Sequence, residues 1–273
     1  MPYSERGYLE GDFRLFHLRD TVSLNEIDYH YHEFHKALLI LGGNVGYGIE
    51  GKHYPLSAGD VVLVPRGCVH KPEVGADAPY ARYVLYLSAA FLRSEPDCPL
   101  DACFTRAEAG GAYVLRLPEA GAWFRQLEAA LAEPGDRFGA ALLGRLAVKQ
   151  LLVALGRALT AANAPAPVFD PQTVRLLRYI NDHLTGDVGA DALAQALYVS
   201  KYHLMRRFRE ETGYSIHRYV SGKRLLYARD LLSRGTAPAD ACFQSGFRDY
   251  SAFARAYKKQ FGVSPGSKIM NNE

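Results

Sequence analysis

Two histidines separated by one residue, His30 and His32, have a spacing that could support binding chemistry. In a β-strand, residues i and i+2 point to the same face, so these two imidazoles would lie side by side. Neutral imidazoles bind Zn, Ni, Cu or Fe, and they also hydrogen-bond polar ligands. The pair therefore indicates either a metal site or a metal-free ligand pocket. His35 has the opposite parity and would join them only if a β-bulge intervened.

A second set of candidate residues is basic and lies in a repeated segment near the C-terminus. Shifting the last third of the chain by 49 residues aligns Gly213 with Gly262 and Arg206 with Arg255. Arg binds guanine O6 and N7 in a bidentate manner, and Lys contacts phosphate. The repeat therefore predicts two equivalent surfaces that bind nucleic acid.

Each copy of the repeat predicts a short helix, a tight turn and a longer second helix, which is the helix-turn-helix layout. In the first copy the helices are expected over 190–197 and from Lys201 to about Thr212, with Ser200 as the N-cap. In the second copy they are expected over 238–245 and from Tyr250 to Phe261. Gly213 and Gly262 are the expected helix stops.

One long helix over 216–232 is expected to join the two copies. It would span about 25 Å, long enough to hold two second helices near one turn of DNA apart, about 34 Å. The alternative is a helical repeat that serves only packing. The expected DNA-binding residues are Lys201, Tyr202, Met205, Arg206 and Arg209 in the first copy and Arg248, Tyr250, Ser251, Arg255, Lys258 and Lys259 in the second.

The distribution of charge agrees with a nucleic-acid-binding C-terminal part. Residues 1–170 hold 16 Lys and Arg against 20 Asp and Glu, a net charge of −4. Residues 171–273 hold 16 and 9, a net charge of +7. A basic part behind an acidic part suggests that only the former meets a polyanion. A solvated basic surface without a partner is the alternative.

Residues 12–90 predict short strands, including 61–64 and 83–87, punctuated by glycine-containing turns. Residues 91–112 are expected to be irregular, and helices are expected over 119–132 and 138–162. The second helix is apolar around most of its circumference, so it either packs inside the domain or also contacts a second copy of the chain. The dimer interpretation uses Leu142, Leu146, Val153 and Leu159.

The fold class expected is therefore α+β in two domains. Residues 1–162 are expected to form a strand-rich domain with helices, 163–171 a linker, and 172–273 an all-α domain with two helix-turn-helix units. The four cysteines lack paired spacing, and no segment reads as a signal peptide or a membrane span. We therefore expect a cytoplasmic protein without disulfides.

The C-terminal hundred residues resemble the DNA-binding domain of AraC/XylS-type transcriptional regulators. The residues that carry the resemblance are Leu193-Ala194, 200–208, 213–215, Arg224-Leu225, Ala228, Leu231-Leu232, 246–251, Phe253, Arg255, 257–259, Phe261-Gly262 and Ser264-Pro265. It implies that Tyr202, Met205 and Arg206 read bases in one half-site. It implies the same role for Arg248, Tyr250, Ser251 and Arg255 in the other.

The front domain resembles the cupin sensor domain of such regulators, a small β-barrel. Residues 59–70 fit the second cupin motif, which ends at His70, and His30-Tyr31-His32 opens the first. Lys36 stands about where the first motif has an acidic metal ligand. The resemblance therefore implies that His30, His32 and His70 meet inside a cupin-like barrel. The effector-binding residues expected are His30, His32, His70, Tyr31, Tyr47 and Tyr83.

The function that these features predict is sequence-specific DNA binding controlled by a small molecule. No cofactor is expected to be required; a transition metal on His30, His32 and His70 is the alternative. The resemblance implies double-stranded DNA, a small-molecule effector and a second copy of the chain as partners, with RNA polymerase added for an activator. A metal-dependent cupin enzyme fused to a DNA-binding domain and an effector-independent DNA-binding dimer are the competing functions. No catalytic triad spacing is present, so an enzyme is not expected.

Overall fold

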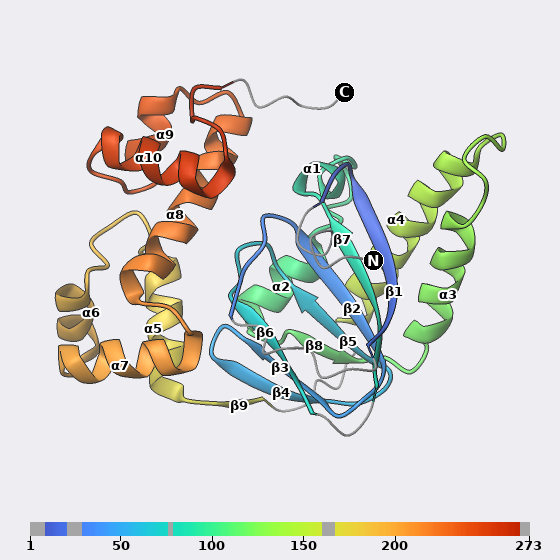
Figure 1. Ribbon diagram of the computed structural model, residues 1–273, viewed down its shortest axis with the longest axis horizontal. Coiled ribbons are helices and arrows are strands. Elements are labelled where there is room, and N and C mark those ends of the chain that lie inside the picture. Colours follow the sequence, from blue (N-terminus) through green and yellow to red (C-terminus); the bar gives the residue numbers. More distant parts are fainter. Residues whose placement is uncertain (1–8, 21–28, 76–78, 160–166, 268–273) are drawn as a thin grey trace. The chain divides into compact units, whose positions relative to one another are not determined.

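The computed structural model describes residues 9–20, 29–75, 79–159 and 167–267. The chain divides into two compact units, an N-terminal unit of residues 1–168 and a C-terminal unit of residues 169–273 (Figure 1). The expected linker, 163–171, includes this division, and its residues 163–166 lie outside the described part of the chain. Among the described residues, no helix is long and apolar enough to cross a membrane.

The N-terminal unit is built on two sheets, in which the strands β1 to β8 pair antiparallel, while the short β9 spans the division between the units. One sheet has the order β1-β7-β2-β5-β8 and the other β6-β3-β4-β9. Their strands are β1 (Phe13–Asp20), β2 (His35–Gly42), β3 (Val45–Ile49), β4 (Lys52–Leu56), β5 (Asp60–Val64), β6 (His70–Val74), β7 (Tyr80–Leu87), β8 (Val114–Arg116) and β9 (Val168–Phe169). The strand-rich, cupin-like fold is confirmed, but among the described residues the strands form two sheets and not a closed barrel.

The segment that carries the paired histidines passes from one sheet to the other. His30 forms a β-bridge with His70 at the start of β6, and the chain enters β2 at His35 five residues later. Alternation along β2 then gives the five-stranded sheet two different faces. Lys36 belongs to one face, whereas His35 belongs to the other, where its ring lies 4.6 Å from that of Phe104.

Helices cover the face of the five-stranded sheet that carries His35. They are α1 (Ala89–Leu92), α2 (Ala102–Gly110), α3 (Ala120–Leu131) and α4 (Ala140–Ala158). The expectation that 91–112 is irregular is wrong, because α2 buries Cys103, Phe104 and Ala107 on one side. Gly111, with a φ of 60°, then ends this short helix.

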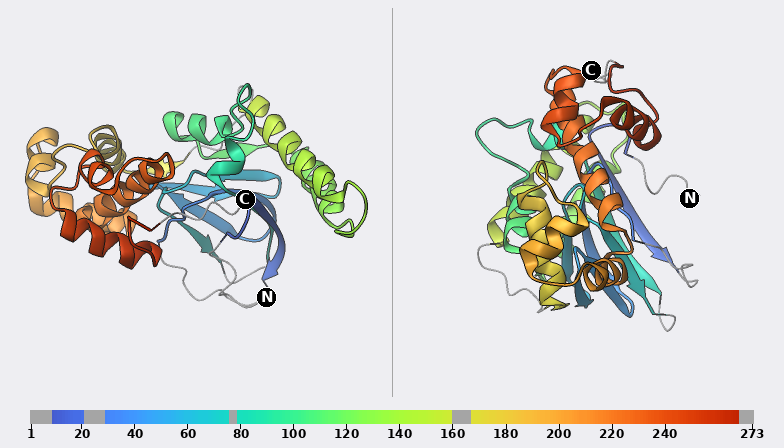
Figure 2. Two further views of the ribbon diagram at one scale, coloured as in Figure 1. Left: turned by 90° about the horizontal axis from the view of Figure 1, so that it is seen from above. Right: turned by 90° about the vertical axis from the view of Figure 1, so that its left-hand side faces the viewer.

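The helices α3 and α4 pack against each other as a hairpin (Figure 2). Helix α4 begins at Ala140, later than expected, and residues 160–162 lie outside the described part. Leu142 and Leu146 are exposed, at 60% and 50%. Val153 and Leu159, which the dimer interpretation also placed on an outer face, instead pack against the core of the N-terminal unit.

The C-terminal unit is helical, with the two-copy organisation that the repeat predicts (Figure 1). In order, its helices are α5 (Pro171–Asp182), α6 (Ala190–Leu197), α7 (Lys201–Thr212), α8 (Ile216–Ser233), α9 (Pro238–Gln244) and α10 (Tyr250–Phe261). The Ser200 hydroxyl caps α7 by accepting from the His203 N–H, and the Asp249 carboxylate caps α10 by accepting from the Ala252 N–H. Gly213 and Gly262 end these helices in the left-handed conformation, so the predicted boundaries of both second helices are confirmed.

Candidate ligand site and nucleic-acid interface

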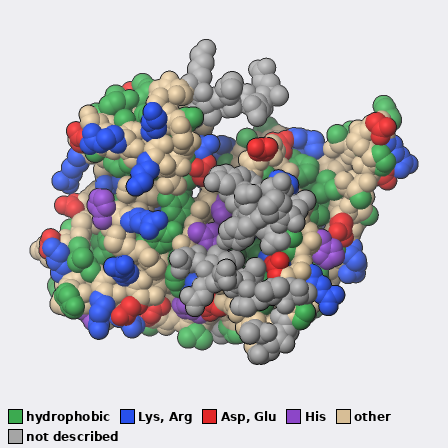
Figure 3. Space-filling view, in the orientation of Figure 1, with side chains coloured by type: hydrophobic (Ala, Val, Ile, Leu, Met, Phe, Trp, Pro, Cys, Tyr) green, Lys and Arg blue, Asp and Glu red, His purple; other side chains and the backbone are tan. Residues whose placement is uncertain are grey.

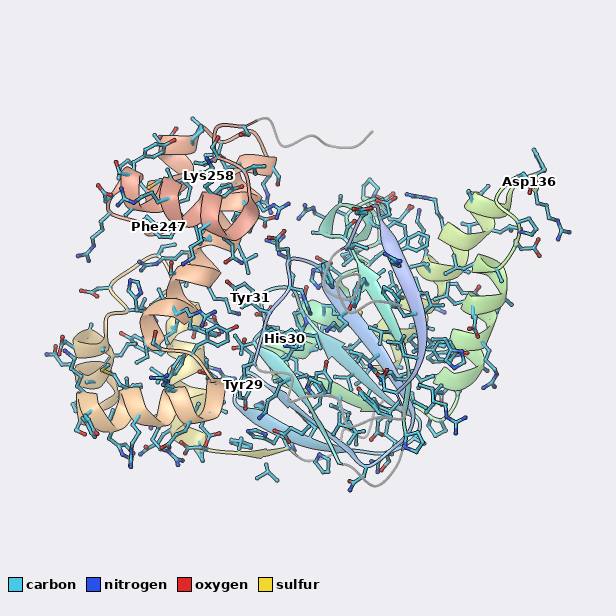
Figure 4. The ribbon with its side chains drawn as sticks, in the orientation of Figure 1. Tyr29, His30, Tyr31, Asp136, Phe247 and Lys258 are labelled. Carbon is cyan, nitrogen blue, oxygen red and sulfur yellow. The ribbon has the colours of Figure 1, made fainter. Side chains whose placement is uncertain are left out.

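Three histidines meet between the two sheets, as the sequence predicts. One ring nitrogen each from His30, His32 and His70 lies within 4.8 Å of the others. His30 and His32 come from the segment before β2, and His70 opens β6. The first two are partly exposed and His70 is fully buried, so the cluster has one accessible side. Figure 4 labels His30 between Tyr29 and Tyr31 on this segment.

The amino group of Lys36 lies at the centre of this cluster. Its Nζ is 3.1 Å from Nε2 of His32 and 3.1 Å from Nε2 of His70. Lys36 is only 6% exposed, and its Nζ lies 5.6 Å from the centre of the Tyr86 ring. The position that the sequence assigned to a missing acidic ligand is therefore filled by a cationic side chain that contacts two of the three imidazoles.

Hydrogen bonding determines the tautomer of His70, and burial determines the protonation of the imidazoles and of Lys36. The Nδ1–H of His70 donates to the carbonyl of Cys68 at 2.9 Å, which leaves its Nε2 lone pair to accept from Lys36. Burial, and next the charge of Lys36, lower the pKa values of His32 and His70 far below the ordinary value, so both imidazoles are neutral. Burial, and next the charge of Arg82, lower the pKa of Lys36 to about 7.

A second buried cation, Arg82, lies on the same face of the five-stranded sheet. Its guanidinium pairs with the carboxylate of Asp20 at 2.7 Å and donates to the carbonyl of Tyr80 at 3.1 Å. Arg82 therefore has a counterion within the protein. Among the described residues, no carboxylate lies within ion-pair distance of Lys36.

The tyrosines expected to line the site differ in position. Tyr47 is buried, and its ring lies parallel to that of His70 with 5.9 Å between centroids. Tyr31 is half-buried beside the histidines. The expectation for Tyr83 is wrong, because alternation along β7 turns it toward α3, where its hydroxyl donates to Glu128 at 2.5 Å. Tyr86, three residues further along, is the aromatic residue of β7 that faces Lys36.

A transition metal does not fit this donor set while Lys36 occupies it. A metal ion needs the lone pairs of the imidazole nitrogens, and two of these accept hydrogen bonds from Lys36. A dication would also lie against a buried amino group that is itself cationic when protonated. We therefore derive no chemistry through a metal at this centre.

In the C-terminal unit, the predicted base-reading residues share the exposed face of α7. Leu204 and Phe208 are buried on its inner face, whereas Tyr202 is 81% and Met205 46% exposed. Arg206 approaches Glu210 only to 4.0 Å. Lys201 pairs with Asp191 at 2.7 Å, and such an exposed pair is worth about 0–1 kcal/mol, little enough to be exchanged for phosphate.

The second copy presents an equivalent face on α10. Phe253 and Tyr257 are buried, and the predicted DNA-binding residues Arg248, Tyr250, Ser251, Arg255, Lys258 and Lys259 are exposed. Figure 4 labels Lys258 on α10, and Figure 3 shows Lys and Arg side chains spread over the visible face of the C-terminal unit. Arg209, Arg255, Lys258 and Lys259 form no ion pair with the described residues.

A groove of about 440 Å³ separates the two copies. It is lined by Met205 of α7, by Arg224 of α8 and by Gly246, Phe247 and Arg248 before α10. Arg224 holds the groove in shape, since its guanidinium donates to the carbonyls of Leu184 at 2.8 Å and Gly186 at 2.6 Å. In the sequence, Arg224 stands out only through the family resemblance. Its hydrogen bonds to carbonyls about 40 residues away cannot be predicted from the residues around it.

Family comparisons agree with both units. The family model described as AraC-like ligand binding domain matches residues 14–148, and the one described as helix-turn-helix domain matches residues 193–268. The chain belongs to the AraC family of transcriptional regulators. The ligand-binding match lies within the N-terminal unit and the helix-turn-helix match within the C-terminal unit.

Individual relatives cover different parts of this AraC-type chain. The HTH-type transcriptional activator RhaS of Escherichia coli O139:H28 is 33% identical over 91 residues, so the match spans about a third of each protein. Fatty-acid-bound ToxT of Vibrio cholerae aligns over 94% of both chains at 15% identity with a TM-score of 0.39. The DNA-binding domain of AdpA in complex with a target DNA aligns over 35% of this chain and 86% of its own, at 28% identity and a TM-score of 0.33.

The arrangement of Lys36 generates a prediction about metal binding. Wild-type protein mixed with equimolar Zn²⁺ and desalted should retain well below one equivalent, because Lys36 occupies two imidazole lone pairs. The variant Lys36→Ala frees them and should gain about one equivalent. Zinc is measured by inductively coupled plasma mass spectrometry.

Lys71, whose side chain is 32% exposed and whose amino group lies 4.0 Å from the carboxylate of Glu73, provides the control, since Lys71→Ala should behave as wild type. One equivalent of zinc on wild-type protein that disappears in His70→Ala would contradict the assignment.

Proposed function

We propose that this chain binds specific DNA sites and regulates transcription in response to a small molecule. The observation that carries the proposal is the pair of capped helices α7 and α10, each with an exposed basic face on a unit of net charge +7 over residues 171–273. Phosphate contacts from the lysines would position the protein, and Arg206 and Arg255 would read base edges.

The N-terminal unit supplies the sensor in this proposal. Its effector would contact His30, His32, His70, Tyr31 and Tyr47. Of these, His32 and His70 hydrogen-bond the buried Lys36, His30 completes the histidine cluster, and the Tyr47 ring lies parallel to that of His70. An effector changes DNA binding only if it binds one arrangement of the protein better than another. The proposed effector-binding residues precede the proposed DNA-binding residues by more than 100 positions in the sequence, so the effector would act on DNA binding indirectly.

We further propose that the protein works without a metal and without catalytic activity. Lys36 supplies the positive charge at the place where a cupin enzyme would hold its metal ion. A metal-dependent enzyme fused to a DNA-binding domain is thereby disfavoured. The protein would act in the cytoplasm at the nucleoid, and RNA polymerase would be its partner if it activates transcription.

A homodimer through α4 is supported by an exposed apolar patch. Phe138 is 102%, Leu142 60%, Leu143 55% and Leu146 50% exposed. The patch lies near the α3–α4 connection, where Figure 4 labels Asp136. Contiguous apolar side chains of this kind mark protein interaction sites, and a second copy would bring two more recognition helices to the operator.

The DNA-binding proposal predicts different effects for two basic residues. Arg206→Ala should cost about 1–3 kcal/mol on the selected operator and flatten the preference at one base position. Lys258→Ala should weaken operator and random DNA alike, with a shallower salt dependence. Sites are first selected from the genome with full-length protein, and affinities are then measured by fluorescence anisotropy. Equal loss on operator and random DNA for Arg206→Ala would remove its base-reading role.

The dimer proposal predicts that charge on α4 separates the copies. Full-length wild-type protein should sediment as a dimer, and the double variant Leu142→Asp/Leu146→Asp as a monomer, because two carboxylates would be buried in the interface. Ala122→Asp, at an exposed position near the start of α3, should remain dimeric. A wild-type monomer at tens of micromolar in analytical ultracentrifugation would refute the interface.

A further inference from the structure

Lys36 has a buried amino group whose hydrogen-bond partners are uncharged. It is 6% exposed, and its hydrogen bonds go to two imidazoles that burial keeps neutral. Buried lysines in proteins are normally paired, because removal of a charge from water is costly. The neighbouring Arg82 follows this rule through Asp20, 2.7 Å away. The part of the chain that the structure describes offers Lys36 no such carboxylate.

A cluster of aromatic rings surrounds Tyr86, whose ring centre lies 5.6 Å from the amino group of Lys36. The ring centre of Phe34 lies 4.4 Å from that of Tyr86 in β7. The ring centre of Phe16, in the neighbouring strand β1, lies 5.1 Å from that of Tyr86. His32 stacks on Phe34 with 4.6 Å between centroids. The surroundings of the cation are therefore suited to an apolar or aromatic group.

A second group between the sheets is also unsatisfied. The Tyr80 hydroxyl is buried and has no hydrogen-bond partner among the described residues. Tyr80 lies on the same face of β7 as Arg82 and Tyr86, since residues two apart share a face. Native proteins rarely leave a buried hydroxyl without a partner, so this one points to a polar ligand.

We propose that Lys36 is the receptor for the carboxylate of an effector whose body is apolar or aromatic. One carboxylate balances the charge of the Lys36 ammonium form, and the rings of Phe16, Phe34 and Tyr86 contact the body of the ligand. The partly exposed side of the cluster, at His30 and His32, is the side from which such a molecule enters. Binding is non-covalent, and the lysine takes over the electrostatic role that a metal ion has in other cupins. The proposal deepens the proposed sensor function and rests on it.

The test measures thermal unfolding of the full-length protein with paired small probes at constant ionic strength. Sodium benzoate is compared with benzamide, and sodium acetate with acetamide, because each pair differs in charge but hardly in shape. At probe concentrations well above the dissociation constant, at least one carboxylate should raise the Tm of wild type by about 2–4 °C over its amide. Lys36→Met should lose this gain, and Lys71→Met should keep it.

Two results would overturn the proposal. The first is a wild-type protein that neither carboxylate stabilises more than its amide, a comparison that does not depend on the folding of any variant. The second is an unchanged carboxylate gain in Lys36→Met. Operator binding is measured on the same preparations. If the protein binds its operator but no carboxylate raises its Tm, the proposed DNA-binding function is retained and the assignment of a carboxylate to Lys36 is wrong.

Discussion

The hydrogen bonds from Lys36 to His32 and His70 are the interaction on which the sensor site depends. They require neutral imidazoles with free Nε2 lone pairs, and the bond from His70 Nδ1 to the carbonyl of Cys68 selects that tautomer. They also join β2 of one sheet to β6 of the other across the interior of the N-terminal unit. The same contacts occupy two imidazole lone pairs that a metal ion would need, and among the described residues no carboxylate pairs with Lys36.

The C-terminal unit follows a simpler constraint, which is the placement of two helix starts. Ser200 and Asp249 cap α7 and α10, and the buried pairs Leu204/Phe208 and Phe253/Tyr257 then determine which faces remain in water. Because caps and apolar spacing recur in both copies, the two exposed faces are equivalent. In the proposed regulation, the sensor therefore needs only to change how these two surfaces reach DNA.

Local patterns explain which features the sequence could predict. Caps, glycine stops and apolar periodicity located α6 to α10 closely, and strand parity together with the cupin motif brought His30, His32 and His70 together. Contacts between distant residues had no such signal. Nothing local to Tyr83 shows that it faces α3, and nothing in 102–110 shows that the sheet will bury one side of α2. The sequence predicts the place of Lys36, but its role depends on the lack of an ion-paired carboxylate among the residues that the structure describes, which only the fold reveals.

The state of the Lys36 amino group can be measured directly. Full-length protein labelled with ¹³C at lysine Cε allows each lysine to be titrated by NMR, and Lys36→Met assigns the resonance. The account predicts a midpoint near the pKa of about 7 that burial and Arg82 impose, well below the ordinary value for lysine. It also predicts that a bound carboxylate raises this midpoint, because an opposite charge favours the ammonium form. A midpoint near 10 without ligand would contradict the account, since Lys36 would then be solvated or already paired with a carboxylate.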